Sequence, residues 1–142
     1  MPVTKYGKYI KREPLGTFAD LHPELTGIEN FRCMGKPWGV NYSVSTTAID
    51  KPFLMEPVPH IHPYDEFLCF IAGNPMNLRD FGAEIELCLG EEQEKHIINS
   101  STAVYIPKEL PHCPLDFKVI TKPIVFLVVM LGDYIKKPVP KK

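Results

Sequence analysis

Residues that interrupt regular structure occur along the whole chain, with 15 prolines and 9 glycines among 142 residues. Proline ends helices because it lacks an N–H and clashes with the preceding turn, whereas short strands joined by turns accommodate it. The chain therefore favours an all-β fold. Its length fits one domain with one core. Its hydrophobic and charged fractions, 44% and 23%, are those of an ordinary globular protein.

Charge and hydropathy exclude several classes of partner. The formal net charge of −1 provides no general basic surface for nucleic acid. The longest apolar run, 124–131, is far shorter than the roughly 20 residues of a membrane-spanning helix. The polar, basic start has no apolar segment behind it, so we expect no secretory signal and a cytoplasmic location. The cysteines lack metal-binding spacing and are expected to remain packed thiols: Cys33, Cys69, Cys88 and Cys113.

The hydropathy pattern predicts several short strands separated by turns. Residues 83–89 alternate, with Ile85, Leu87 and Leu89 on one face, which is typical of a half-buried strand. Residues 124–131 are apolar on both faces, as in a sheet that is covered on each side. Further strands are expected at 40–49, 66–71, 103–106 and 119–120, a short helix or turn near 21–30, and a solvated hairpin loop at 91–95.

We expect a single domain, 1–142, in which the strands form a sandwich or small barrel at about 38–132. An N-terminal arm (1–37) and a basic C-terminal tail (133–142) are expected to be loosely held.

The segment His60-Ile61-His62-Pro63-Tyr64-Asp65-Glu66 carries the most chemical information. Side chains at i and i+2 of an extended chain leave one face about 6.6 Å apart, so two imidazoles can converge on one metal ion. Glu66 shares their parity and can supply a third ligand. Two histidines and a carboxylate form a triad that leaves metal positions open for substrate or oxygen.

Together with a later segment, these residues resemble the two motifs of the cupin superfamily. The first segment, with Gly73, resembles G-x5-H-x-H-x3-E-x6-G, and residues 107–112, Pro-Lys-Glu-Leu-Pro-His, resemble the second motif, G-x5-P-x-G-x2-H-x3-N. The match covers about 40–131. Leu54 stands at the first glycine of the first motif. Ser101, Glu109 and Asp116 replace the Gly, Gly and Asn of the second motif.

The resemblance implies a double-stranded β-helix, or jelly-roll barrel, with a short N-terminal helix or turn. It further implies that His60, His62, Glu66 and His112 bind one divalent transition metal, such as Fe, Mn, Ni or Zn. Small cupins of this kind usually pair through sheet edges and exchanged N-terminal segments, so a homodimer is expected, and exposed strand edges give a physical reason for pairing.

The fold does not define the reaction, since cupins include oxygenases, isomerases, decarboxylases, sugar-binding regulators and storage proteins. The first hypothesis is a metal-dependent enzyme that acts on a small oxygen-rich metabolite. The second is a non-catalytic cupin that binds or senses a small molecule through the same ion. A purely structural metal fits less well, because structural zinc sites are closed and usually rich in cysteine.

Other side chains have a functional and a structural interpretation. Glu84 and Glu86 share one strand face. Either of them is capable of acting as a general base beside a metal, but we favour the interpretation that both face solvent. Arg32 and Arg79 are capable of clamping a carboxylate, although the sequence places neither near the metal. The remaining candidates are loop residues beside the site (Lys108, Glu109), rim or pocket aromatics (Trp38, Tyr42, Tyr64), core or cavity-wall residues (Phe70, Phe126, Val128) and histidines outside the motifs (His22, His96).

Overall fold

A computed structural model describes residues 4–18, 21–25, 27–133 and 135–140. Its regular elements are strands and short 3-10 turns, and no α-helix occurs among these residues. The turns are η1 (Gly7–Tyr9), η2 (Pro23–Leu25) and η3 (Lys36–Trp38). The strands are β1 (Leu15–Gly16), β2 (Asn30–Met34), β3 (Ser43–Ile49), β4 (Phe53–Glu56), β5 (His60–Ile61), β6 (Glu66–Ala72), β7 (Ala83–Leu89), β8 (Glu94–Ile98), β9 (Thr102–Ile106), β10 (His112–Ile120), β11 (Ile124–Met130) and β12 (Lys137–Pro138).

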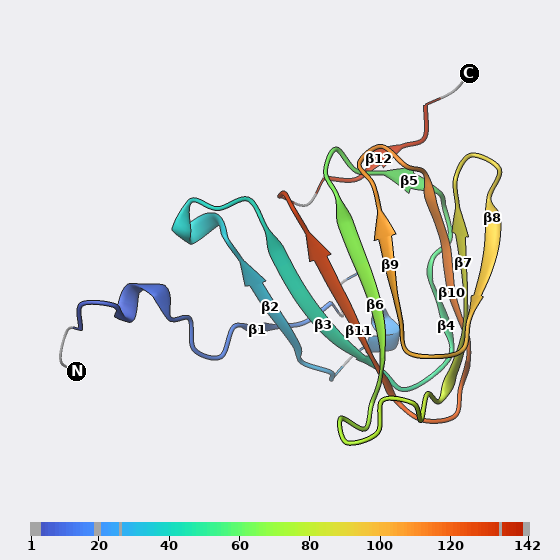
Figure 1. The fold of residues 1–142 in the computed structure, drawn as a ribbon, viewed down its shortest axis with the longest axis horizontal. Coiled ribbons are helices and arrows are strands. Elements are labelled where there is room, and N and C mark those ends of the chain that lie inside the picture. Colours follow the sequence, from blue (N-terminus) through green and yellow to red (C-terminus); the bar gives the residue numbers. More distant parts are fainter. Residues whose placement is uncertain (1–3, 19–20, 26, 134, 141–142) are drawn as a thin grey trace.

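The strands form two antiparallel sheets that pack face to face (Figure 1). We call the sheet with strand order β1-β2-β3-β11-β6-β9 sheet A. Sheet B has the order β12-β5-β10-β7-β8, and β4 pairs with β10 beside β5. Consecutive strands often lie in different sheets, so the chain crosses repeatedly between the two layers. This arrangement confirms the predicted all-β fold of two antiparallel sheets.

The core lies between the two sheets and follows from the alternation of apolar residues. Ile85 and Leu87 of β7 are fully buried, as their shared parity predicts. Phe70 of β6 and Phe117 of β10 bring sheets A and B into contact, with ring centroids 6.2 Å apart. The interior is therefore filled at one end by aromatic and branched side chains.

The chain makes a tight turn after β6, as Gly73 predicts. A Cβ atom at Gly73 would collide with the backbone oxygen of Pro123, so a larger residue would displace the neighbouring turn. β6 ends at Ala72 and pairs with β11 along its whole length, from Glu66 opposite Met130 to Ala72 opposite Ile124. This register fixes the position of Glu66 at the end of sheet A.

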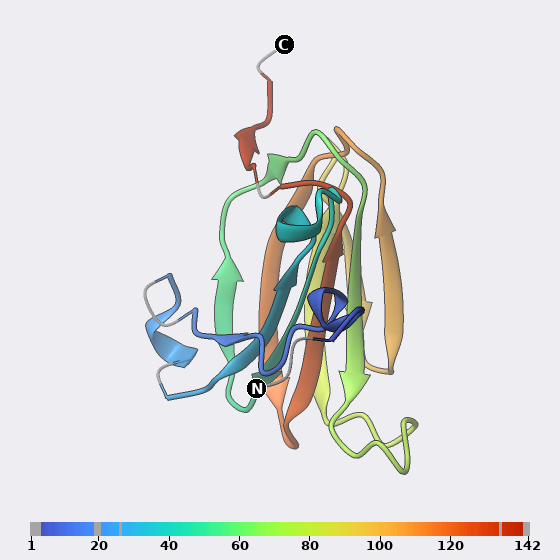
Figure 2. The same ribbon diagram turned by 90° about the vertical axis from the view of Figure 1, so that its left-hand side faces the viewer.

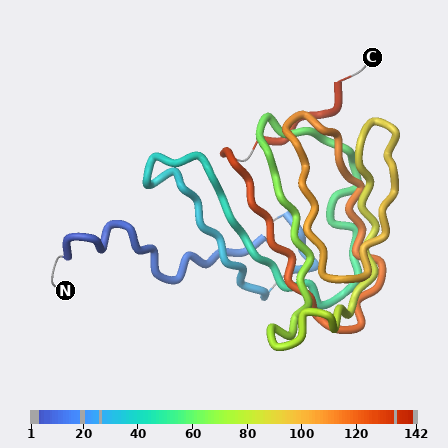
Figure 3. Tube along the Cα trace, in the orientation of Figure 1, coloured from blue at the N-terminus to red at the C-terminus, as the bar shows by residue number. Residues whose placement is uncertain are grey.

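The two ends of the chain differ from each other. The N-terminal segment reaches away from the sheets (Figure 3), and a view from that side shows it in front of the strands (Figure 2). The C-terminal segment, which was expected to be loose, instead pairs through β12 with β5. The short strand β5 offers free backbone groups at the edge of sheet B, and this pairing satisfies them.

The prediction near 21–30 was only partly right. The 3-10 turn η2 begins at Pro23, where proline fits a first turn, but Asn30 already belongs to β2. Thr26 lies outside the described residues.

Candidate metal centre

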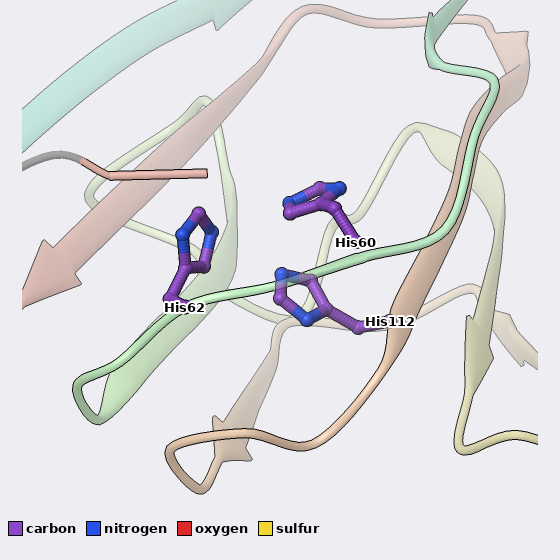
Figure 4. Close-up of side chains that lie close together, drawn as sticks. All are labelled: His60, His62 and His112. Carbon is purple, nitrogen blue, oxygen red and sulfur yellow. The ribbon is translucent and has the colours of Figure 1, made fainter. Parts of the chain in front are cut away.

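Three histidines from two neighbouring segments meet at one end of the interior (Figure 4). His60 belongs to β5, His62 follows it directly, and His112 begins β10 opposite His60 in the antiparallel ladder. Their ligand nitrogens all lie within 4.8 Å of one another. All three side chains are buried. The cluster is consistent with a divalent metal site.

Glu66 adds a carboxylate to this cluster. Its Oε2 lies 3.3 Å from His62 Nε2, and its Oε1 lies 3.6 Å from His112 Nε2. The side chain enters from the first residue of β6, which the pairing with β11 fixes opposite Met130. The structure thus brings together all four residues that the cupin resemblance implies as ligands.

The backbone holds each imidazole in the orientation that a ligand requires. His60 Nδ1 donates to the oxygen of Val58 at 3.3 Å, and His112 Nδ1 donates to that of Leu110 at 3.0 Å. His62 Nδ1 faces the oxygen of Ile135 in the same way. Because each Nδ1 carries the proton, each Nε2 presents a lone pair. Carbonyl partners of this kind fix the tautomer of metal-bound histidines.

Two polar atoms at the centre of the cluster lack a hydrogen-bond partner. They are Glu66 Oε2 and His112 Nε2, and both are buried. Buried polar atoms without partners are rare because they have lost water and gained nothing in return. A cation between them would satisfy both. This donor set of imidazole nitrogens and one carboxylate therefore fits the divalent transition metals that the sequence predicts.

Burial shifts the proton affinities of the cluster in opposite directions. It is the main cause that raises the pKa of Glu66 from 4.5 to about 7, and the nearby Glu56 carboxylate contributes a smaller part of this rise. Burial lowers the pKa of His112 from 6.5 to about 4, and it also lowers the pKa of His60 and of His62. The charged form is disfavoured in each case. The imidazoles are therefore neutral near pH 7, and Glu66 is the group that competes for a proton.

Tyr64 supports His62 from behind. Its ring stacks on the imidazole with centroids 5.0 Å apart, and its hydroxyl lies 3.2 Å from His62 Nδ1. The hydroxyl accepts from the N–H of Ile135 at 3.2 Å and donates to Met130 Sδ at 3.3 Å. Tyr64 is buried and does not line the cavity. It thus holds His62 in position from beneath the histidine cluster.

The loop before His112 carries Glu109 at the position where the motif has a glycine. Glu109 has a φ of 67°, the left-handed conformation that glycine adopts without strain. Its N–H donates to the oxygen of His62 at 2.9 Å, and the N–H of Lys108 donates to Asp65 Oδ1 at 3.0 Å. These bonds tie the two motif segments together. Lys108 and Glu109 are exposed and lie outside the cavity wall.

A cavity of about 230 Å³ extends from the cluster between the sheets. Its wall is largely apolar and includes Leu68, Leu115, Phe126 and Val128. Ligand sites commonly combine such a wall with a few polar groups. The volume lies below the usual range for drug-sized ligands, roughly 300–1,000 Å³, so the cavity suits a small metabolite.

Arg32 of β2 also lines this cavity, whereas Arg79 does not. Its guanidinium carbon lies 4.6 Å from the centroid of the Phe18 ring. Among the described residues, no carboxylate forms an ion pair with Arg32. The sequence offered no reason to choose Arg32 over Arg79. The pairing of β2 with β3, in which Arg32 lies opposite the cavity residue Ser45, places it there.

Two further cavity residues differ from the sequence interpretation. Glu56 lines the cavity and pairs with Lys136 at 2.8 Å, although it belongs to neither motif segment. His22, interpreted as a surface or structural residue, also lines the cavity, and its ring lies 6.1 Å from that of Phe53. No sequence motif marks either position. Both reach the cavity through the fold.

The other candidates lie outside the cavity. Glu84 and Glu86 point from the outer face of sheet B, which confirms a solvent-facing stripe. His96 is exposed and pairs with Glu94 at 2.6 Å. Trp38 donates from its indole N–H to the oxygen of Lys8 at 2.7 Å. Tyr42 donates a hydrogen bond to Cys33 Sγ, and Phe70 lies in the core. All four cysteines are free thiols, as expected.

No protein-family model matches the sequence, and no curated protein matches it as a relative. Solved structures do resemble it. The polyketide cyclase RemF from Streptomyces resistomycificus has a TM-score of 0.56 and 14% identity, over 94% of this chain and 85% of its own. A sugar phosphate isomerase from a cupin superfamily of Silicibacter pomeroyi has a TM-score of 0.52 and 17% identity, over 80% of this chain and 64% of its own.

A variant of Bacillus subtilis oxalate decarboxylase also superposes, with a TM-score of 0.54 and 15% identity over 91% of this chain. This chain spans 32% of that enzyme. Identities this low define the fold alone. The protein therefore has the cupin fold, with a buried three-histidine cluster at one end of its single small barrel.

Proposed function

We propose that this protein is a metal-dependent enzyme of the cupin fold that acts on a small oxygen-rich metabolite. His60, His62, Glu66 and His112 are the proposed ligands of one Fe, Mn, Ni or Zn ion. The observation that carries the proposal is the buried cluster itself. Each Nδ1 there is engaged by a backbone oxygen, and Glu66 Oε2 and His112 Nε2 are left without partners.

A metal held by these four side chains supplies Lewis-acid or redox chemistry to an oxygen-bearing substrate. The residues of the chain prepare that site. Tyr64 and the oxygen of Ile135 fix the orientation of His62. The apolar wall formed by residues such as Leu68 and Phe126 limits the entry of water.

Arg32 indicates the charge of the substrate. It is the only lysine or arginine among the described residues that line the cavity, and it has no ion-pair partner there. A guanidinium binds a carboxylate through paired N–H donors. The favoured substrate therefore carries a carboxylate at one end and hydroxyl or keto oxygens at the metal end, with an apolar body between them.

Glu56 is the candidate for proton transfer. Apart from Glu66, it is the only carboxylate among the described residues that line the cavity. A carboxylate beside a metal-bound substrate is suited to accept or return a proton. The structures that resemble this chain include a cyclase, an isomerase and a decarboxylase. They support an enzyme, and the reaction class, whether oxygenase, isomerase or decarboxylase, stays open.

The second candidate is a non-catalytic protein that binds or senses a metabolite through the same ion. The observation that favours it is the ion pair between Glu56 and Lys136, at 2.8 Å. This pair engages the carboxylate on which proton transfer would depend. Turnover distinguishes the two candidates, because a binder shows ligand-induced stabilisation without product.

The test has two stages. Metal analysis of protein purified without added metal is expected to find about one divalent transition ion per chain in the native sequence and in His96→Ala, a control at an exposed histidine. His112→Ala should lose it. The loaded protein is then offered hydroxy acids, keto acids and phenolic acids, and product is followed by mass spectrometry. Product from one class supports the enzyme, whereas melting shifts without product support the binder. Equal metal content in His112→Ala would reject the metal site.

A further inference from the structure

One strand of the cavity wall, β3 of sheet A, carries hydroxyl groups. Ser43, Ser45 and Thr47 alternate along this strand, and all three line the cavity. Because side chains alternate between the two faces of a strand, they share the inward face. Thr46, which stands between the last two, belongs to the outward face and does not line the cavity. The strand β3 lies between β2 and β11 (Figure 1).

The register of sheet A shows where these hydroxyls lie relative to the metal cluster. One row across the sheet consists of Leu68, Val128, Ser45 and Arg32, on β6, β11, β3 and β2. Glu66 begins β6, two residues before Leu68. Neighbouring strands lie about 4.8 Å apart, so β3 is about 10 Å and β2 about 14 Å from β6. A molecule that extends from the cluster to Arg32 therefore meets an apolar wall first and hydroxyl groups beside its far end.

The protein itself does not use these hydroxyls. In the part of the chain that the structure describes, no hydrogen bond engages the side-chain oxygen of Ser43, Ser45 or Thr47. Thr47 is nevertheless only 4% exposed. Most buried side-chain polar atoms in proteins have a partner. A ligand in the cavity is able to supply the partner that these oxygens lack.

An unpaired amide lies next to the hydroxyls. Asn30 shares the inward face of β2 with Arg32, and because Phe31 pairs with Thr46, Asn30 is the neighbour of Thr47. Asn30 is 3% exposed, and neither its Oδ1 nor its Nδ2 has a hydrogen-bond partner. We call these four side chains the polar strip: Asn30, Ser43, Ser45 and Thr47. Each of them is able both to donate and to accept a hydrogen bond, as a ligand hydroxyl does.

The polar strip and Arg32 select different groups of a ligand. The guanidinium of Arg32 favours a carboxylate, whereas the uncharged strip favours neutral groups that donate and accept. A ligand without hydroxyls at this end would cover the strip and leave its polar atoms unpaired. Sites built to bond a substrate hydroxyl discriminate against analogues that lack it for this reason.

We infer that the cavity selects a hydroxy acid, in which one or more hydroxyl groups adjoin the carboxylate that Arg32 binds. Ser45 and Thr47 are the specificity residues, since both line the cavity and Ser45 lies directly opposite Arg32. The inference rests on the proposed metal-dependent function, and it specifies the end of the substrate that is remote from the metal.

The test compares two acids that differ by one hydroxyl group. Dihydroxyphenylpropanoate and dihydroxyphenyllactate both carry a catechol that chelates a metal, and the second adds a hydroxyl beside the carboxylate. The full chain is loaded with zinc, which has no redox chemistry and leaves the catechol intact. In isothermal titration, dihydroxyphenyllactate is expected to bind the native protein about tenfold more tightly, because it forms a hydrogen bond that the other acid cannot form.

Variants of β3 assign this preference to the polar strip. Thr47→Val keeps the size of the side chain and Ser45→Ala removes one oxygen, so each should bring the two affinities to within about threefold of each other. Thr46→Val, on the outward face of the same strand, is the matched control and should keep the full preference. If Thr47→Val does not fold, Ser45→Ala decides alone.

The zinc content of every sample, measured after titration, separates two kinds of failure. A native protein that binds no zinc would overturn the proposed function and this inference with it. Zinc-loaded protein that binds both acids equally, or binds neither, would overturn the inference and leave the metal site intact. A preference that Ser45→Ala and Thr47→Val both retain would also overturn it.

Discussion

Replacement of Glu66 by glutamine is expected to stabilise the metal-free protein at alkaline pH. Burial raises the pKa of Glu66 from 4.5 to about 7, so the folded state binds this proton more tightly than the unfolded state does. The stability that results is present below pH 4.5 and is lost as the pH rises through 7. Each tenfold change in proton affinity is worth about 1.4 kcal/mol, so the ionised carboxylate costs about 3 kcal/mol above pH 7.

Glu66→Gln removes this cost because its amide is neutral at every pH. In EDTA at pH 8, its free energy of unfolding should exceed that of the native protein by up to about 3 kcal/mol, or by roughly 6–12 °C in Tm. Below pH 5 the two proteins should be equally stable. The lowered pKa of His112 destabilises both forms in acid alike, so the difference between their pH profiles isolates Glu66.

Urea unfolding across pH 4.5–8.5 measures this difference. Glu84→Gln, on the outer face of sheet B, is the control and should give a flat difference. With added metal the order should reverse, because the native carboxylate binds the ion and a ligand at 100 times its Kd adds about 2.7 kcal/mol. Metal affinity should also fall as the pH drops below about 7, where Glu66 takes up a proton. If Glu66→Gln were less stable than the native protein in EDTA at pH 8, the electrostatic argument would be refuted.

Three further outcomes are expected. Arg32→Gln should weaken the binding of a carboxylate ligand at least tenfold by isothermal titration, because a charge-assisted hydrogen bond contributes about 1.5–3 kcal/mol. Metal content should not change. Arg79→Gln is the control, and equal losses of affinity in both variants would count against the assignment. Glu56→Gln should lower kcat by about 10²–10⁴-fold with metal content retained, and an unchanged kcat would remove Glu56 from proton transfer. Glu109→Gly should raise the free energy of unfolding by about 0.5–1 kcal/mol, because glycine adopts a left-handed φ without strain. The control Glu92→Gly should not raise it. A loss of stability in Glu109→Gly would show that the loop carries no such strain.

The strongest strand signals in the sequence were confirmed because burial enforces them. Residues 83–89 alternate and form β7 over the same range. The apolar run at 124–131 forms the central strand β11 of sheet A. These strands have core faces that only one register can satisfy. Their hydropathy therefore carries the structural information directly.

The strands β2 and β8 escaped prediction because tertiary pairing creates them. Residues 91–95 were interpreted as a charged loop, but β8 begins at Glu94 and pairs with β7. Asn30 to Met34 carried no strand pattern and lay partly in an expected turn. At such positions the backbone ladder supplies the stability, and side-chain periodicity is weak.

The candidate site likewise contains residues that the sequence identifies and residues that only the fold brings to it. The cupin resemblance selected the four residues that the fold brings together from β5 and the residue after it, the start of β6 and the start of β10. Tyr64, which the sequence suggested as a rim or pocket aromatic, instead supports His62, as does the oxygen of Ile135 in the C-terminal segment, which no local pattern marks. Glu56 and Arg32 reach the cavity from strands of different sheets. Only the three-dimensional arrangement identifies them.

Anomalous diffraction from crystals of the metal-loaded protein tests the central claim most directly. The account predicts one strong peak between the Nε2 atoms of His60, His62 and His112 and the carboxylate of Glu66. Data on both sides of the absorption edge would identify the element. A peak elsewhere on the chain, or none among these side chains after soaking with each candidate ion, would contradict the account.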